Sequence, residues 1–398
     1  MSPAAKKSTP PKKTATKPAK SPQKPAQRTA TVLVSGTQDD GNVRWLTGFS
    51  APDPFLVALA PNGRPHLFVS ALEARRATQA AKPGATVHVY RRNALDALLD
   101  WAKDEKIAAF AAGPAVPYGL VRDLQQGGFP VDLPANPRAA FRGRETKTDT
   151  EIRCIALAQA AAAAAIRRAR AILREATVAP DRARTLRWQG KVLTSERLRD
   201  AMEAVIRAHA CASDDGLIAA GGRQAACPHE SGHGPLRAGE TIVLDVFPRH
   251  QPSGYWGDMT RTLMKGPPKN PQILAMYRAV LEAQRIAFRM VRPGESGANV
   301  HLAVQAYFVA AGFPLDTSRP GHERGMFHGL GHGVGLDIHE EPRLSPSSSG
   351  RLRAGNVVTV EPGLYDPAIG GIRIEDTIVV RSTAPQFLSV PPRSLLIP

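Results

Sequence analysis

The stretch TIVLDVFPRHQPSGYWGDMTRT, residues 241–262, contains two strand-like segments on either side of a polar turn. Strands are expected at 241–246 and 255–264, because β-branched, apolar and aromatic residues recur in both. Each strand carries one acid where a core residue is expected, Asp245 in the first and Asp258 in the second. An isolated buried carboxylate is very costly, so it must be neutralised, paired or bound to a cation.

The same arrangement recurs near the carboxyl end of the chain. The segment VVTVEPG (357–363) carries Glu361, the segment GGIRIEDT (370–377) carries Glu375, and a YDPAIGG turn links them. Arg373 lies two residues from Glu375 and so on the same strand face, but one cation cannot balance four carboxylates. A pair of divalent ions can balance all four carboxylates. Acids on facing strands about 5 Å apart are able to bridge two such ions.

Histidines concentrate in HGLGHGVGLDIHE, residues 328–340, where His328, His332 and His339 stand among glycines. The residues alone leave open whether these histidines touch a metal, a substrate or one another. One imidazole added to the four carboxylates gives a mixed oxygen and nitrogen ligand set. Such a set suits Mn²⁺, Co²⁺, Zn²⁺ or Fe²⁺ better than Ca²⁺.

Residues 144–398 divide into two halves with the same order of elements, which predicts a pseudo-symmetric α/β domain. In each half, segments with helical spacing precede the strands. The first half is expected to have helices at 149–175 and 195–209 and strands at 216–220, 241–246 and 255–264. The second half is expected to have helices at 271–291 and 299–311 and strands at 334–338, 357–361 and 371–380.

A smaller α/β domain is expected at residues 31–143, because strand-like and helix-like segments alternate there. FLVALAPNGRPHLFVS (55–70) predicts two strands joined by a PNG turn. The boundary to the next domain is placed within residues 135–153, which are polar and turn-prone. Asp39, Asp40 and His66 are interpreted as loop or surface groups.

The first thirty residues form a basic tail. They hold seven lysines, one arginine and no acid, and the whole chain has a net charge of +17. Their composition predicts disorder. The tail is interpreted as a solubilising leader or as a loose contact to nucleic acid or another polyanion through counterion release. No apolar segment follows the charges, so a secretory signal is not expected.

The three cysteines, Cys154, Cys211 and Cys227, are far apart and form no CxxC pair. This pattern argues against a disulfide framework and for a reducing compartment, so a cytoplasmic location is expected. It also excludes a zinc site built from cysteines. No segment reaches the roughly eighteen apolar residues of a membrane helix, and no membrane contact is expected.

In order and context, the acids and histidines resemble those of the pita-bread metallopeptidases, which include Xaa-Pro aminopeptidases, prolidases and methionine aminopeptidases. The matching segments are the strand aspartate, GDMTRT, GHGVG, VEPG and RIED. The resemblance is close over about residues 144–398. Residues 42–61 are more loosely similar to the creatinase-like amino-terminal domain of the proline-specific branch. The resemblance implies five metal ligands: Asp245, Asp258, His332, Glu361 and Glu375.

The resemblance also implies roles for residues around the metals. His229 and His339 are expected to line the substrate site, and His328 to be a further active-site histidine. Glu361 is expected to act as general base as well as ligand. Arg373 is expected to hold a ligand carboxylate through a charge-assisted bond. Tyr365 could reach the site or pack on the hairpin, and the residues do not decide between these.

The implied activity is hydrolysis of the N-terminal Xaa-Pro bond of peptides by an Xaa-Pro aminopeptidase. Two divalent ions are expected, Mn²⁺ first, with Co²⁺, Zn²⁺ or Fe²⁺ as alternatives. An Xaa-Pro dipeptidase (prolidase) is the alternative activity, and a homodimer or larger homo-oligomer is expected. Two further alternatives would lack some of the metal ligands. One is creatinase, which has this fold but no metal, and the other is a non-catalytic binding protein with a polyanion-binding tail. None of the five ligands is missing here.

Overall fold

The computed structural model describes residues 28–35, 40–136 and 139–398. The chain divides into two compact units, one of Met1–Val34 with Pro54–Pro137 and one of Ser35–Asp53 with Arg138–Pro398. Residues 1–27 of the predicted tail and Asp39 lie outside the described residues. The second unit therefore takes in residues 35–53 in addition to the catalytic segment expected from residue 144 onwards.

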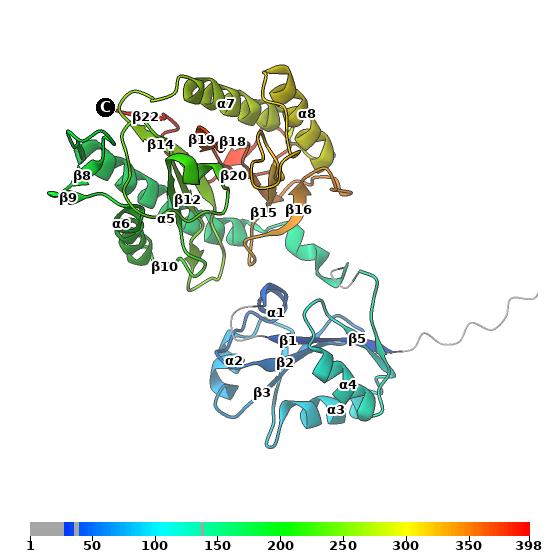
Figure 1. Cartoon of the computed structure of the whole chain (residues 1–398). Helices are drawn as coiled ribbons and strands as arrows, with labels where there is room; N and C mark the ends of the chain where they lie inside the picture. Colours follow the sequence, from blue (N-terminus) through cyan, green and yellow to red (C-terminus); the bar gives the residue numbers. More distant parts are fainter. Residues whose placement is uncertain (1–27, 36–39, 137–138) are drawn as a thin grey trace, which may run out of the picture. The chain divides into compact units, whose positions relative to one another are not determined.

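The first unit is a six-stranded mixed sheet with strand order β4-β3-β2-β1-β5-β6 (Figure 1). The predicted hairpin forms β2 and β3, which pair antiparallel, whereas β3–β4, β1–β5 and β5–β6 are parallel. Helices connect the parallel strands, as the alternation in the sequence predicts. The bounds are β1 Thr29–Ser35, β2 Phe55–Leu59, β3 Pro65–Val69, α2 Ala74–Ala80, β4 Thr86–Val89, α3 Ala94–Asp104, β5 Ala109–Ala112, α4 Tyr118–Gln126 and β6 Val131–Asp132.

Two residues interpreted as loop or surface groups have defined structural roles. His66, on β3, is only 7% exposed, and its Nδ1 lies 2.9 Å from Nε2 of His88. Its ring also packs on Trp101 of α3 with a centroid distance of 4.7 Å. Asp40 caps the unpredicted helix α1 (Gly41–Thr47), because its Oδ1 accepts from Asn42 N at 2.8 Å. The surface interpretation of His66 was therefore wrong.

The second unit contains two main sheets, each covered by a pair of helices. The four-stranded sheet β11-β12-β14-β22 shares a hydrophobic core with α5 and α6, and the five-stranded sheet β16-β15-β17-β20-β21 shares one with α7 and α8. Figure 1 shows both helix pairs beside their strands. The helices are α5 Asp149–Glu175, α6 Ser195–Ala208, α7 Gln272–Met290 and α8 Gly297–Ala310.

The strands of this unit are short, and several begin or end next to a site residue. The main sheets are built from β11 Ile218–Gly221, β12 Ile242–Val246, β14 Met259–Lys265, β15 Gly331–Gly333, β16 Glu340–Leu344, β17 Val357–Val360, β20 Asp376–Val379, β21 Gln386–Phe387 and β22 Leu396–Ile397. The remaining elements are η1 Ala139–Glu145, β7 Thr177–Val178, β8 Leu186–Trp188, β9 Lys191–Val192, β10 Cys211–Ala212, η2 Gly222–Ala226, β13 Arg249–His250, β18 Gly363–Asp366 and β19 Gly370–Arg373.

Helix α5 has the bounds predicted from the sequence. Its start is fixed by a capping box, in which Thr148 Oγ1 accepts from Glu151 N at 3.3 Å and the Glu151 carboxylate accepts from Thr148 N at 2.8 Å. Its alanine-rich face is buried, which lets strands approach the helix axis closely. The helix ends where Ala176 adopts extended backbone.

Several predicted strands are shorter than expected or lie elsewhere. The strand expected at 255–264 begins only at Met259, and the one expected at 371–380 is divided into β19 and β20. No strand covers 334–338, because the chain turns between β15 and β16. Three of the four acids consequently lie one residue outside a strand rather than within it.

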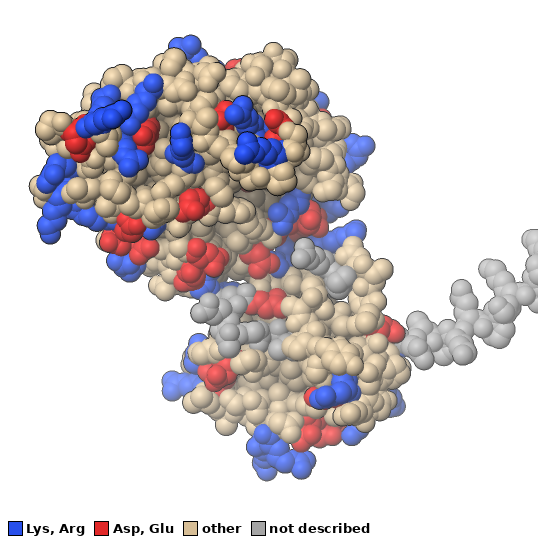
Figure 2. All heavy atoms as spheres, viewed as in Figure 1, with Lys and Arg blue, Asp and Glu red and all other residues tan. Residues whose placement is uncertain are grey.

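The surface carries both signs of charge. Figure 2 shows Lys and Arg side chains spread over the visible face together with Asp and Glu.

All three cysteines are free thiols. Within the described part of the chain, no helix combines the length and the apolar character that crossing a membrane requires.

Candidate active site

One cavity of about 1340 Å³ in the second unit gathers every site residue singled out from the sequence. Its walls are formed by loops and strand ends from both halves of the unit. The predicted site residues that line it are His229, Asp245, Asp258, His328, His332, His339, Glu361, Arg373 and Glu375.

The first half of the unit contributes two aspartates through the β12–β14 ladder. Asp245 lies opposite Thr260 in this antiparallel ladder, and Asp258 precedes β14 by one residue. Because side chains alternate along a strand, Asp258 and Thr260 point to the same face. The Thr260 hydroxyl lies 2.8 Å from Asp245 Oδ1 and 2.9 Å from Glu375 Oε2, so it connects the two halves.

The second half contributes two glutamates from the end of the β17–β20 ladder. Val360 and Asp376 are the last pair of this ladder, and Glu361 and Glu375 are the residues next to them. Their side chains therefore emerge side by side where the two strands separate. The Thr359 hydroxyl donates to Glu361 Oε1 at 3.2 Å and orients that carboxylate.

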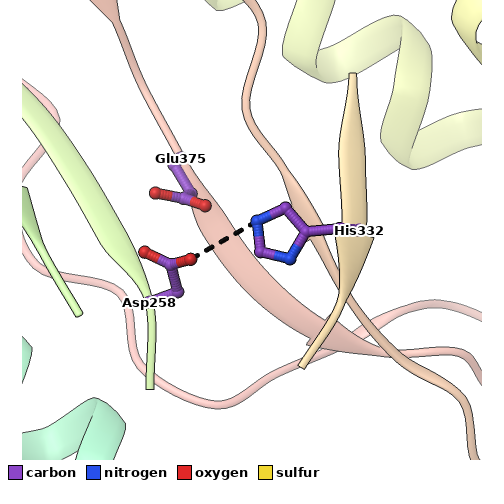
Figure 3. Close-up of side chains that lie close together, drawn as sticks. All are labelled: Asp258, His332 and Glu375. Atoms are coloured by element: carbon purple, nitrogen blue, oxygen red, sulfur yellow. Dashed lines mark ion pairs between the residues drawn. The ribbon is translucent and has the colours of Figure 1, made fainter. Parts of the chain in front are cut away.

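His332 completes the cluster from the middle of β15. Its Nδ1–H donates to the carbonyl of Gly333 at 3.1 Å, which turns Nε2 toward the acids. Nε2 lies 3.2 Å from Glu361 Oε1 and 3.5 Å from Asp258 Oδ2. Figure 3 shows His332, Asp258 and Glu375 pointing toward one another from three segments, and their ligand atoms all lie within 4.8 Å of one another.

The glycines beside His332 allow neighbouring strands to approach. A Cβ at Gly331 would lie 2.1 Å from the Thr359 carbonyl oxygen, and one at Gly333 would lie 2.5 Å from the Glu341 carbonyl oxygen. Any side chain at either position would push β15 away from β17 or β16. The glycines therefore fix the place of His332 by letting neighbouring backbone approach β15 closely.

The carboxylates are more buried than their charge allows without a cation. Asp258 is 5% exposed and Glu375 is 2% exposed. Burial, followed by repulsion from Asp245, raises the pKa of Asp258 well above its usual range, and burial with repulsion from Asp258 does the same to the pKa of Glu375. The oxygen-rich donor set and its excess negative charge fit divalent cations.

Glu361 and His332 form an ion pair inside this cluster. Burial acts to raise the pKa of Glu361, but the hydrogen bond and charge of His332 outweigh it and bring this pKa to about 2. Burial likewise acts to lower the pKa of His332, but Glu361 and Asp258 raise it to about 9. In the chain alone, a proton on His332 balances the Glu361 carboxylate and Arg373 balances Asp245, whereas among the described residues Asp258 and Glu375 have no arginine or lysine of their own.

Arg373 lies against both an acid and a tyrosine. Its Nη2 donates to Asp245 Oδ2 at 2.7 Å, and its Nη1 donates to the Tyr365 hydroxyl at 2.8 Å. That hydroxyl lies 2.9 Å from His328 Nε2, and His328 Nδ1–H donates to the Gly329 carbonyl at 2.7 Å. Since His328 donates through Nδ1, its Nε2 accepts from Tyr365. Tyr365 therefore reaches the site and connects Arg373 to His328.

His229 and His339 lie on the open side of the cavity. The His339 ring meets the His332 ring edge to face, with a centroid distance of 4.3 Å. Burial and the charge of His332 lower the pKa of His339 to about 4, so this imidazole is neutral at neutral pH. Both side chains line the cavity and are available to a bound molecule.

The sequence did not single out the threonines that orient the acids. Thr260 stands two residues after Asp258, and Thr359 stands two residues before Glu361. The two-residue period of a strand places each threonine on the face of its acid. That spacing was an available signal for Thr359, which donates to Glu361. It did not indicate the partners of Thr260, whose hydroxyl contacts Asp245 and Glu375 on other segments.

Comparison with known families matches both parts of the chain. A family model described as metallopeptidase family M24 matches residues 153–382. A second, described as the creatinase/prolidase N-terminal domain, matches residues 28–133.

Individual relatives show the same similarity. An Xaa-Pro dipeptidase from Pyrococcus horikoshii is 35% identical over 180 residues, 45% of this chain and 48% of that protein. A putative Xaa-Pro aminopeptidase from Mycoplasma pneumoniae is 34% identical over 177 residues, 43% of this chain and 46% of that protein. The chain thus matches about half the length of these relatives. The solved Xaa-Pro dipeptidase from Bacillus anthracis shares the fold, with a TM-score of 0.77 at 24% identity over 93% of this chain and 95% of that one.

Proposed function

Because the chain belongs to metallopeptidase family M24, we propose that it is a divalent-metal-dependent peptidase acting on Xaa-Pro bonds. The observation that carries the proposal is the convergence of four carboxylates and one imidazole in a single cavity. The residues proposed to hold two divalent ions are Asp245, Asp258, His332, Glu361 and Glu375.

The fold class expected from the sequence is confirmed. The chain is an α/β protein with a creatinase-like N-terminal domain ahead of a pita-bread metallopeptidase domain. In this fold the two halves of the catalytic domain each supply ligands. The metal site therefore depends on how the halves are held together.

Divalent ions bound by this ligand set would lower the pKa of the attacking water and polarise the peptide carbonyl. Mn²⁺ is the proposed ion, and Co²⁺, Zn²⁺ and Fe²⁺ also suit a mixed oxygen and nitrogen set. Glu361 is the proposed general base, because Thr359 orients its carboxylate toward the other proposed ligands and a positioned carboxylate can accept a proton from the attacking water.

The histidines on the open side are proposed to serve the peptide. Neutral His339, and His229 opposite, would donate N–H groups to the developing oxyanion or to the leaving nitrogen. Removing one such donor typically costs about 10²–10³ in rate. His328 is held by Tyr365, and Arg373 fixes both Tyr365 and Asp245, so these groups keep the cavity wall in place during the reaction.

An Xaa-Pro aminopeptidase is the proposed specificity. The cavity of about 1340 Å³ exceeds the roughly 300–1,000 Å³ of common small-molecule pockets, which leaves room for peptides longer than two residues. The creatinase-like domain and His328 favour the proline-specific branch over methionine aminopeptidase.

An Xaa-Pro dipeptidase is the second candidate, and one residue favours it. Arg343 lines the same cavity, and its positive charge is close enough to His339 to act on that ring. A cation in that position suits the C-terminal carboxylate of a dipeptide. The names of several relatives point the same way.

The test compares hydrolysis of Gly-Pro and Arg-Pro-Pro after metal removal and after return of Mn²⁺ or Co²⁺. Metal-dependent cleavage that Glu361→Ala abolishes is the expected result. Glu282→Ala is the matched control, because Glu282 lies on α7 outside the lining of the cavity and should leave the rate unchanged. A preference for the tripeptide supports the aminopeptidase, and cleavage of the dipeptide alone supports the dipeptidase. Cleavage unaffected by metal removal would refute the proposal.

Assembly and location follow from the same proposal. A homodimer or larger homo-oligomer and a cytoplasmic location remain predictions. Light scattering on the purified chain and fractionation of cells would test them.

A further inference from the structure

A buried glutamine on α5 binds the backbone of a proposed metal ligand. Gln159 is fully buried, its Nε2 donates to the Asp258 carbonyl at 2.7 Å, and its Oε1 accepts from Asp258 N at 2.9 Å. Asp258 lies just outside the β12–β14 ladder, so Gln159 supplies the pair of bonds that a neighbouring strand would otherwise provide. The Thr377 hydroxyl also donates to the Asp258 carbonyl, at 2.8 Å.

The residue before Asp258 allows this contact. A Cβ at Gly257 would lie 2.7 Å from Gln159 N and 2.7 Å from the Ala158 carbonyl carbon. The chain therefore passes directly against the surface of α5 at this point. Only glycine permits the Asp258 backbone to come within reach of the short glutamine side chain.

The second half of the domain contains a corresponding glutamine. Gln284, on α7, is 1% exposed, and its Nε2 lies 3.2 Å from the Val360 carbonyl and 3.1 Å from the Ile374 carbonyl. These residues directly precede Glu361 and Glu375. The same Nε2 lies 3.1 Å from Asp376 Oδ2. Gln284 therefore joins two strands at the point where both acids leave the ladder.

We propose that Gln159 and Gln284 are a pair of positioning residues, one in each half, which hold the ligand-bearing backbone and so set the metal affinity. The inference rests on the proposed metal-dependent function. Each glutamine reaches from the helix that covers its own half, so helix packing and ligand geometry are connected. Without the amides, the Asp258 N–H would lose the side-chain acceptor that Gln159 provides, and the Asp258, Val360 and Ile374 carbonyls would each lose one donor. The strand ends would then shift to recover hydrogen bonds.

The experiment measures Mn²⁺ affinity of the full chain by calorimetry, together with the thermal midpoint without metal. Gln159→Met and Gln284→Met keep the length of the side chain and remove both amide functions. We expect the dissociation constant of Mn²⁺ to rise about 10–100-fold in each, the size typical for groups behind metal ligands. Ile166→Ala on α5 and Val280→Ala on α7 are the matched controls, since both side chains are fully buried and offer no hydrogen bond.

The controls should lower the thermal midpoint and leave the Mn²⁺ dissociation constant within about threefold of the wild type. Wild-type affinity in both methionine variants, or an equal loss in the controls, would overturn the inference while the proposed function stands. Failure of the wild type to bind Mn²⁺ would overturn both. If a methionine variant does not fold, Gln159→Asn and Gln284→Asn keep the amide but draw it back by one methylene, out of reach of the ligand-bearing backbone, and weaker Mn²⁺ binding is again required.

Discussion

Thr260 and Asp245 face each other across the β12–β14 ladder, and the Thr260 hydroxyl lies 2.8 Å from Asp245 Oδ1. The same hydroxyl lies 2.9 Å from Glu375 Oε2 and accepts from Arg373 Nε at 3.2 Å. A hydroxyl has one proton, so it can donate to only one of the two carboxylates at a time. The carboxylate that receives no proton from Thr260 then needs a proton or a cation of its own. Thr260 therefore makes the charge state of Asp245, in one half, depend on that of Glu375, in the other.

Replacing Thr260 with valine should therefore weaken metal binding. Valine keeps the shape and removes the hydroxyl, so Asp245 and Glu375 lose a shared partner and Arg373 loses an acceptor. We expect the Mn²⁺ affinity and kcat/KM to fall about 10–100-fold. Thr260→Ser keeps the hydroxyl and should stay near the wild type in both measurements. Equal behaviour of the two variants would show that the hydroxyl does not orient the ligands.

Removing one buried negative charge should stabilise the metal-free chain. Asp258→Asn removes the carboxylate whose pKa is raised by burial and by repulsion from Asp245. The thermal midpoint without metal should therefore increase. The same change should abolish stabilisation by Mn²⁺, which in the wild type reaches about 2.7 kcal/mol at a hundredfold excess over the dissociation constant. Thermal unfolding with and without Mn²⁺ measures both effects. Glu203→Gln serves as control. If Mn²⁺ stabilises Asp258→Asn as much as it stabilises the wild type, Asp258 is not a metal ligand.

The acids and histidines of the site were predictable because their chemistry is visible in the sequence. A carboxylate among Val and Ile residues violates the usual pattern of a strand, and four such violations indicate a common cause. The location of Asp258, Glu361 and Glu375 just outside the strands was not predictable. It depends on where neighbouring backbones stop pairing, which is decided by residues distant in sequence.

The supporting residues could not be recognised from local patterns. Gln159 stands in an alanine-rich helix, and nothing near it indicates that Asp258, 99 residues later, needs two backbone partners. His66 was interpreted as a loop or surface group, whereas its position on β3 places it against Trp101 and His88. Such contacts arise from tertiary packing and become visible only when the elements are placed in space.

The contact between buried His66 and half-buried His88 in the first unit should make stability depend on pH. Burial, then the neighbouring His88, lower the pKa of His66 to about 4, below its ordinary value of 6.5. Between these values the unfolded chain binds a proton that the folded chain does not, so the free energy of unfolding falls as pH falls from about 6.5 to 4. His66→Gln keeps a hydrogen-bonding side chain but does not titrate. Its thermal midpoint should therefore fall less than that of the wild type between pH 7 and 4, and parallel curves would exclude this role.

The basic tail should determine contacts with polyanions. Residues 1–27 hold seven lysines and no acid, whereas the folded surface mixes both signs of charge (Figure 2). Deleting these residues should weaken binding to single-stranded DNA and reduce its salt dependence, by up to about 0.7 in log–log slope for each lysine that contacts a phosphate. Hydrolysis of Arg-Pro-Pro should be unchanged. A scrambled tail of the same composition is the control and should retain binding, and undiminished binding after deletion would refute the idea.

Arg343 should decide how well a dipeptide is bound. If its guanidinium pairs with the C-terminal carboxylate of Gly-Pro, Arg343→Met removes a charge-assisted bond worth about 1.5–3 kcal/mol, or about 10–150-fold in KM. The KM for Arg-Pro-Pro should change less, because its carboxylate lies one residue further along. Arg199→Met is the matched control: Arg199 lines the same cavity, but its Nη1 already donates to the Gly232 carbonyl at 2.6 Å. A parallel rise of KM for both peptides in Arg343→Met would assign Arg343 a general role in the cavity wall and remove the main structural argument for a dipeptidase.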